Sequence, residues 1–193
     1  LRLSFHSERE HPMWPYKNAS YEKIYTEAKA MNDEIIRFAG EKSLAATTTI
    51  HFGAANEIAM RAVRNLGYKN IAGYFEFDTE GNPMVAYYYP PELITHVGGR
   101  DFWRDTDLDV TYLRIDRVMN LAKTPEENIA EIDKVLAIPE RAEFIELMIH
   151  EQYFYEKYDG YIEKFGEIIL ECCKHLKEKG YVSTFIEDAV KEY

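Results

Sequence analysis

The chain has 193 residues, of which 46% are hydrophobic and 30% charged, and its formal net charge is -11. This composition fits a folded domain with a sizeable core and excludes a disordered chain. The acidic balance repels phosphate backbones and anionic lipid surfaces, so we expect neither nucleic acid nor a membrane surface as partner. No apolar run is long enough to span a bilayer.

The first 77 residues alternate between strand and helix patterns. In chain order we expect a strand over 1–6, a helix over 20–39, a strand over 44–50, a helix over 56–66 and a strand over 71–77. The first strand follows from the alternation of Leu1, Leu3 and Phe5. Ser20 is a good N-cap for the first helix, and Gly40 is a good residue to end it.

The middle of the chain predicts fewer regular elements. In chain order we expect a turn over 80–83, a hairpin partner over 84–89, irregular chain over 92–109, a segment ambiguous between strand and helix over 110–121, and a helix from 124 to 139. Thr124 and Pro125 are the N-cap and first-position residues of that helix. The stretch of about 80–123 is therefore expected to be an irregular insertion.

The last part returns to strand and helix. We expect a strand over 144–149 that ends at His150, an aromatic loop over 151–159, a helix over 161–179 and a last strand over 181–186. Cys172 and Cys173 fall on this helix, and adjacent cysteines seldom close a bridge. We expect both to be buried free thiols, and free thiols favour a reducing compartment and hence a cytoplasmic location.

Three of the six histidines directly follow predicted strands. These are His6, His51 and His150. Strands that alternate with helices predict a mainly parallel sheet or a barrel. In such folds the loops after the carboxyl ends of the strands carry the functional site. The placement of these histidines is therefore the main indication of function.

Three blocks of sequence carry a resemblance to a known family. Residues 6–12 read His-Ser-Glu-Arg-Glu-His-Pro, residues 50–57 run into a Leu-Gly-Tyr at 66–68, and residues 145–151 read Ile-Glu-Leu-Met-Ile-His-Glu. In order, they resemble the His-(Ser/Thr)-x-x-His-Pro, Arg-x-Pro-x-Gly and Leu-x-His-Asp blocks of the polysaccharide deacetylase family, the NodB-type homology domain of carbohydrate esterase family four. The likeness covers roughly the first 77 and the last 50 residues.

The resemblance implies both a fold and an activity. The fold is an α/β, distorted (β/α) barrel of the polysaccharide deacetylase type, one domain over residues 1–193, without its first strand or strands. The activity is metal-dependent removal of an acetyl group from a carbohydrate-like small molecule or glycan, with Zn as the expected ion and Co or Fe as alternatives. The resemblance makes His6 and His11 metal ligands and His150 the catalytic acid.

Four further side chains are candidates for substrate binding: Trp14, His51, Tyr153 and Tyr155. Aromatic rings pack on the faces of sugars, and His51 follows a predicted strand. Each has a plainer alternative, as a turn residue or as aromatic packing under a loop. Surface histidines on a polar loop are the corresponding alternative for His6 and His11. A histidine hydrogen-bonded to a backbone carbonyl is the alternative for His150.

The chain departs from the family at several positions, and these departures keep two other functions open. The family's Asp-Asp pair, which supplies the base and the third metal ligand, is absent, and the spacing from His6 to His11 is one residue longer. Thr49 and His51 stand where the family has arginine and proline, and Glu151 where it has aspartate. The alternatives are a carbohydrate-binding relative without catalysis and a metallohydrolase of a non-carbohydrate C–N bond. Glu8 and Glu10 are expected to be solvated, or else to replace the missing carboxylate.

A barrel without its first strands would expose two sheet edges, which is a liability in solution. We therefore expect an upstream segment or a second chain to complete the sheet. The family resemblance points to the cell envelope, whereas the free thiols point to the cytoplasm.

Overall fold

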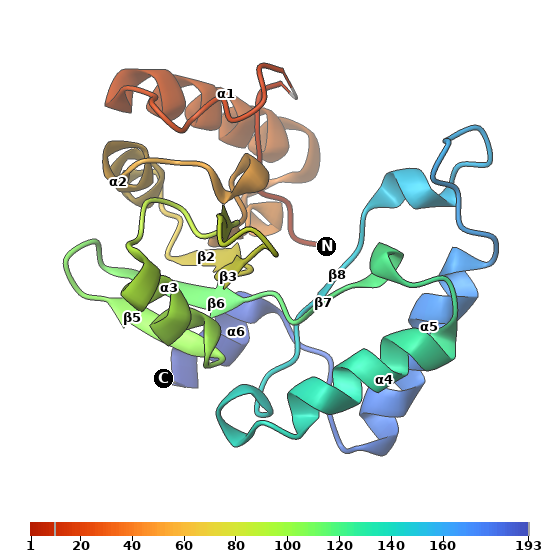
Figure 1. Cartoon of the computed structure of the whole chain (residues 1–193). Helices are drawn as coiled ribbons and strands as arrows, with labels where there is room; N and C mark the ends of the chain where they lie inside the picture. The colour runs from red at the N-terminus through yellow and green to blue at the C-terminus, as the bar shows by residue number, and fades with distance from the viewer. Residues whose placement is uncertain (10, 193) are drawn as a thin grey trace. The chain divides into compact units, whose positions relative to one another are not determined.

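The computed structural model describes residues 1–9 and 11–192, and it is mixed α/β with small sheets (Figure 1). The chain forms two compact units. The first unit combines Leu1–Arg114 with the segment from Phe185 onward, and the second is Ile115–Thr184. Each unit is described below by itself, and the single-domain barrel stays a prediction. No described helix is long and apolar enough to cross a membrane.

The first unit contains a four-stranded sheet. In spatial order its strands are β1 (Thr47–Thr48), β2 (Asn70–Gly73), β6 (Val110–Arg114) and β5 (Phe102–Asp105). The first three strands are parallel, and β5 is antiparallel to β6. Every residue of β2 and β6 is buried. Burial on both faces is typical of the inner strands of a parallel sheet, and the polar residues Asn70, Thr111 and Arg114 are buried along with the apolar ones.

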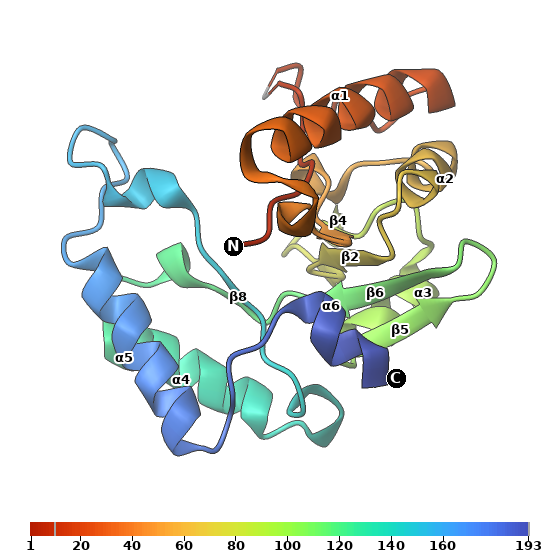
Figure 2. The ribbon, with the colours of Figure 1, turned by 180° about the vertical axis from the view of Figure 1, so that it is seen from behind.

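The helices of the first unit begin at good capping residues. They are α1 (Tyr21–Ala39), α2 (Glu57–Asn65), α3 (Pro91–Gly98) and the short α6 (Ile186–Ala189). The Ser20 side chain accepts the Lys23 N–H at the start of α1, and Asn56 accepts the Ala59 N–H at the start of α2. In Figure 1 α1 lies over α2, and Figure 2 shows α6 beside β6. The helix starts at 20 and 56 are confirmed.

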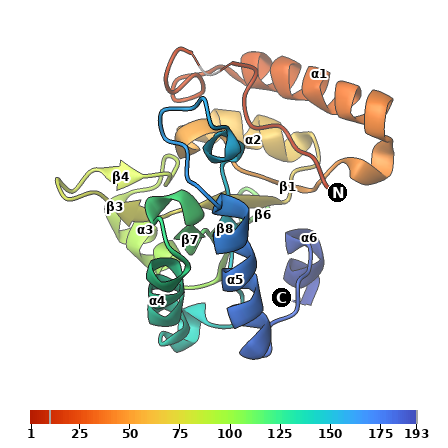
Figure 3. The ribbon, with the colours of Figure 1, turned by 90° about the vertical axis from the view of Figure 1, so that its right-hand side faces the viewer.

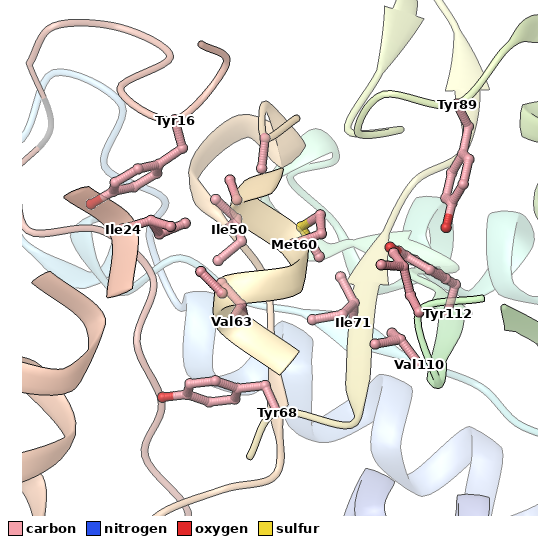
Figure 4. Close-up of a cluster of buried hydrophobic side chains, with 14 of the residues drawn as sticks. Tyr16, Ile24, Ile50, Met60, Val63, Tyr68, Ile71, Tyr89, Val110 and Tyr112 are labelled. Carbon is pink, nitrogen blue, oxygen red and sulfur yellow. The ribbon is translucent and has the colours of Figure 1, made fainter. Parts of the chain in front are cut away.

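Figure 4 shows how α1, α2, β2 and β6 contribute to one buried cluster. Its labelled members are Tyr16, Ile24, Ile50, Met60, Val63, Tyr68, Ile71, Tyr89, Val110 and Tyr112. The Tyr68 hydroxyl is one of the polar groups within it. It accepts the Phe5 N–H at 2.9 Å and donates to Asn32 Oδ1 at 2.5 Å. Burial raises the pKa of Tyr68.

The segment expected as the first strand runs beside residues 43–51 without forming a regular ladder. Leu3 exchanges backbone hydrogen bonds with Ser43 and Ala45, as an isolated parallel bridge. At Phe5 side chains replace the backbone partners, because its N–H bonds Tyr68 and its carbonyl accepts from the Thr48 hydroxyl. The predicted strand is therefore a segment with one backbone bridge at Leu3 and two side-chain hydroxyls bonded to the backbone of Phe5.

The predicted hairpin forms between β3 (Glu76–Phe77) and β4 (Pro83–Met84), paired antiparallel, but the partner strand expected over 84–89 does not continue beyond Met84. Asp78 closes its turn by accepting the N–H groups of Glu80 and Asn82, each at 2.8 Å. Hydrogen bonds from the Asn82 side chain and backbone lower the pKa of Asp78. Glu76 forms an ion pair with the buried side chain of Arg114.

The second unit is built on two parallel strands and two helices. The elements are β7 (Arg117–Val118), α4 (Pro125–Leu136), β8 (Leu147–Met148) and α5 (Phe165–Glu178), with 3-10 turns η3 (Met119–Leu121), η4 (Pro139–Arg141) and η5 (Glu151–Phe154). Figure 3 shows α4 and α5 together with β7 and β8. His175 Nε2 on α5 lies 2.8 Å from Asp133 Oδ1 on α4, and this contact lowers the pKa of Asp133. Cys172 is a buried free thiol, as expected, whereas Cys173 is a free thiol that is exposed and not buried.

Besides the expected first strand, two further stretches of the sequence prediction are wrong. The irregular insertion contains the regular elements α3 and β5, because Pro91 occupies the first position of a helix, where a missing N–H costs nothing. The strand expected over 181–186 is absent from the described chain, which leads into α6 instead. Tyr181 packs on the core of the second unit, but Val182 is 86% exposed, and within the described chain no strand pairs with this segment.

Candidate functional site

In the first unit, His6 and His51 lie against each other. His6 Nε2 is 3.1 Å from His51 Nδ1, and the two rings are perpendicular with centroids 5.1 Å apart. The backbones are joined as well, because the His51 N–H donates to the His6 carbonyl at 3.2 Å. The pair follows the carboxyl end of β1, at the edge of the parallel sheet where function is expected.

A tight turn directly after His51 fixes the direction of its side chain. Phe52 and Gly53 both have positive φ, at 55° and 57°. Gly53 also has no room for a side chain, since a Cβ there would lie 2.6 Å from Val85 Cα. Val85 has a positive φ of 44° as well. Backbone strain concentrated in this way is typical of functional sites.

The hydrogen-bond network assigns the tautomers of the two imidazoles. His6 Nδ1 is 2.5 Å from the carbonyl of Thr49, which can only accept, so Nδ1 carries the hydrogen. His6 Nε2 is then an acceptor, and the hydrogen shared by the pair belongs to His51 Nδ1. His51 Nε2 is buried and has no hydrogen-bond partner among the described residues. A buried group of this kind costs about 1–3 kcal/mol.

The structure does not join His11 to His6 within the part of the chain that it describes. The His11 side chain is exposed, and no hydrogen bond, ion pair or ring contact links it to described residues. Glu8 is paired with Arg9 at 3.5 Å and is largely solvated, as expected. Glu10 lies outside the described residues. The imidazole next to His6 is therefore His51, which the sequence assigned to substrate binding.

The donor atoms around His6 suit a transition-metal ion in part. A metal-binding histidine usually donates its outer ring nitrogen to a carbonyl or carboxylate, as His6 does to Thr49. Among the described residues, however, no group of three or more potential metal ligands comes together. His6 and His51 thus offer two imidazole donors, and the expected ligand role of His11 stays a prediction.

In the second unit, His150 is hydrogen-bonded to Asn120. His150 Nδ1 lies 2.8 Å from Asn120 Oδ1. Asn120 follows β7 and His150 follows β8, and because these strands are parallel both residues lie at the same edge. The amide oxygen accepts, so Nδ1 carries the hydrogen and Nε2 is the nitrogen that can exchange a proton. Sequence reasoning missed Asn120, which has no predicted role in the sequence analysis.

The aromatic residues after His150 differ in their surroundings. Tyr153 packs edge to face on Tyr158 at 5.3 Å and also contacts Phe165, so part of its ring is core. Burial and the neighbouring Tyr158 raise the pKa of Tyr153. Tyr155 is 62% exposed. Of this pair, Tyr155 has more ring surface open to a ligand.

Trp14, the remaining aromatic candidate, lies in the first unit. Its ring is half exposed, and the ammonium of Lys17 lies 5.1 Å from the ring centroid. This cation–π contact gives Trp14 a local structural role. Its role in substrate binding stays a prediction.

A cavity of 720 Å³ lies elsewhere in the first unit. Its lining includes Arg2, Asn70, Arg104, Thr111 and Glu187. Asn70 and Thr111 are at the amino ends of β2 and β6, whereas His51 follows the carboxyl end of β1. The cavity is therefore at the opposite edge of the sheet from the histidine pair.

No family model matches the chain, and comparison with curated proteins and with solved structures gives no match.

A buried carboxyl pair precedes the strands of the second unit. Asp116, whose side chain is 3% exposed, pairs with Arg141 at 3.1 Å and accepts the Glu146 N–H at 3.0 Å. Burial raises the pKa of Glu146 well above its usual range, and the neighbouring Asp116 carboxylate raises it further. These residues lie at the amino ends of β7 and β8, away from His150, and this placement indicates a role in stability.

We expect Glu146 to make the chain less stable as the pH rises. In the folded chain the pKa of Glu146 is above that of an unfolded glutamate, about 4.3, so the folded state binds the proton more tightly. The stability that this proton binding adds is fully present below about pH 4.3 and is lost as the pH rises through the folded pKa. Glu146→Gln removes this titration. The free energy of unfolding, measured in urea by circular dichroism, should therefore fall less between pH 5 and pH 8 than in the unmodified chain. The exposed Glu163→Gln is the control, and equal pH dependence in both variants would contradict the assignment.

Proposed function

We propose that this chain is a metal-dependent hydrolase that removes an acetyl group from a carbohydrate-like substrate. The observation that carries the proposal is the His6–His51 pair, whose ring nitrogens are 3.1 Å apart after the carboxyl end of β1. Two imidazoles held at a strand end are an arrangement suited to a divalent ion. The three blocks that resemble polysaccharide deacetylases supply the reaction class.

The chain's own residues have distinct roles in this proposal. When bound, a divalent ion supplies polarisation of the acetyl carbonyl and makes water more acidic. His6 and a second imidazole would hold that ion. The resemblance gives His150 the role of the acid: its Nε2 would first take up a proton released by the attacking water and then pass it to the departing nitrogen or oxygen, while Asn120 accepts the hydrogen on Nδ1. Tyr155 offers its exposed ring to a sugar face.

A carbohydrate-binding protein without catalysis is the second candidate. The observation in its favour is the exposure of ring surface on the segment after His150, where Phe154, Tyr155, Tyr158 and Tyr161 are each more than a third exposed. Aromatic faces of this kind bind sugars without any metal or proton transfer. The two candidates differ in whether acetate is released.

The proposed function predicts large losses of activity when His150 is changed. With Zn- or Co-supplemented protein and acetylated chito-oligosaccharides, we expect His150→Ala to lower kcat about 10²–10⁴-fold, the usual contribution of a general acid. Asn120→Ala should give a smaller loss and Asn120→Asp should retain most activity, because a carboxylate can still accept the Nδ1 hydrogen. The measurement is the rate of acetate release, with small linear and cyclic amides assayed in parallel.

His96→Ala is the matched control for this series, because His96 is an exposed histidine that contacts Arg100 on its own helix end. It should leave acetate release unchanged. Release of acetate at the same rate from His150→Ala would remove His150 from the reaction. Sugar binding without acetate release by the unmodified chain would favour the second candidate, and turnover of amides alone would change the substrate class.

A further inference from the structure

We propose that His6 and His51, rather than His6 and His11, are the imidazole pair that binds the divalent ion. The inference deepens the proposed function, since it names the second histidine of the same site. It rests on the separation of two ring nitrogens, on the fixed tautomer of His6 and on the backbone that holds both residues.

The separation of the two nitrogens suits a shared ion. Two imidazole nitrogens on one tetrahedral zinc ion, each at about 2.0–2.1 Å, lie about 3.3 Å apart. His6 Nε2 and His51 Nδ1 are 3.1 Å apart. A shared ion therefore needs little change in the separation of the two nitrogens, and each ring has to turn only until its lone pair points at the ion instead of at the other ring.

The tautomer of His6 is already the one that a metal requires. Thr49 accepts the Nδ1 hydrogen, so the lone pair of His6 is on Nε2, the nitrogen that faces His51. The carbonyl of Thr49 then acts as the outer partner that orients a ligating imidazole. His51 reaches the ligating form when its hydrogen moves from Nδ1 to Nε2, and the proton count of a neutral imidazole is unchanged.

The backbone holds the two rings in register before any ion arrives. The His51 N–H donates to the His6 carbonyl. Phe5, the residue before His6, donates its N–H to the Tyr68 hydroxyl and accepts at its carbonyl from the Thr48 hydroxyl. His11, in contrast, is exposed and has no such support among the described residues. A preorganised pair binds an ion with less loss of conformational freedom than a pair that includes an exposed loop residue.

The chemistry of the donors indicates the kind of ion. Neutral imidazole nitrogens favour Zn, Co, Ni and Cu, whereas Mg and Ca require oxygen ligands. Two protein ligands leave the remaining positions to water and substrate. We therefore expect an exchangeable ion that binds more weakly than one in a closed structural site with four protein ligands.

The test is a titration of the full chain with Co²⁺, followed by visible absorption and by competition with a chelating indicator. We expect His6→Ala and His51→Ala each to weaken binding by at least about tenfold, since loss of even an outer partner costs 10–100-fold. His11→Ala and His96→Ala should bind Co²⁺ as the unmodified chain does. Circular dichroism checks that each variant is folded.

Three results would overturn the inference: unchanged Co²⁺ binding in His51→Ala, a loss in His11→Ala equal to that in His6→Ala, or no Co²⁺ binding by the unmodified chain. The third result would leave a hydrogen-bonded imidazole pair without a metal. Because binding is read without substrate, this outcome is separate from the acetate assay. A chain that binds Co²⁺ through His6 and His51 but releases no acetate would keep the inference and reject the proposed function.

Discussion

Tyr68→Phe should lower the free energy of unfolding by about 2–4 kcal/mol, because each buried group left without a partner costs about 1–3 kcal/mol. The hydroxyl that is removed accepts the N–H of Phe5 and donates to Asn32, and both of these residues are buried. The substitution removes one oxygen atom and leaves the ring packing intact. The expected loss therefore comes from hydrogen bonding and hardly from cavity formation.

Tyr25→Phe is the matched control for this prediction. Tyr25 stacks on Tyr21 with centroids 5.5 Å apart, and its hydroxyl has no hydrogen bond among the described residues. Its loss should change stability by less than about 0.5 kcal/mol. Urea unfolding followed by circular dichroism measures both variants. Equal stabilities would show that the Tyr68 hydroxyl does not hold the segment before His6.

Gly53→Ala should be nearly as damaging, for a different reason. The residue has a φ of 57°, and a Cβ would lie 2.6 Å from Val85 Cα, which is backbone and cannot rotate away. An alanine at positive φ costs about 1–2 kcal/mol, and overpacking typically adds 1–3 kcal/mol. The total expected loss is about 2–5 kcal/mol. Since the turn follows His51, Co²⁺ binding should weaken in the same variant.

Gly67→Ala separates the two contributions. Gly67 also has a positive φ, 101°, at the end of α2, but nothing lies within 4 Å of the position that its Cβ would take. It therefore bears the backbone cost without the steric clash. The difference in unfolding free energy between the two variants measures the close approach of Val85 to Gly53. A difference near zero would mean that the Val85 segment moves aside easily.

Local signals in the sequence were sufficient for several elements of the fold. Ser20 and Gly40 bracket α1 as expected, because capping is decided by residues within one turn of the helix end. The hairpin at Asp78 was predicted from its turn residues for the same reason. The start of α3 was missed within the stretch expected to be irregular, although Pro91 favours the first position of a helix.

The arrangement of the site depends on distant contacts, and the sequence predicted it only in outline. A strand-end placement for His6, His51 and His150 was expected, but the proximity of His6 to His51 requires two segments 45 residues apart to run in parallel register. Asn120, 30 residues from His150, was missed although it follows β7 as His150 follows β8. Two-residue strands give little periodic signal, so their ends could not be located closely enough.

The path of the chain through the two units has a consequence for the order of folding. The first unit consists of a long segment that ends at Arg114 and a short one that begins at Phe185. In the short segment, Glu187 pairs with Arg2 at 3.4 Å and accepts a hydrogen bond from the Thr47 hydroxyl. The second unit is one continuous segment between them. During synthesis, residues 115–184 can acquire all their internal contacts before the first unit has its last ones. In a ribosome-stalled chain that exposes residues 1–184, the second unit should therefore resist protease. The Thr47 hydroxyl on β1 would at that stage still be without its acceptor, Glu187.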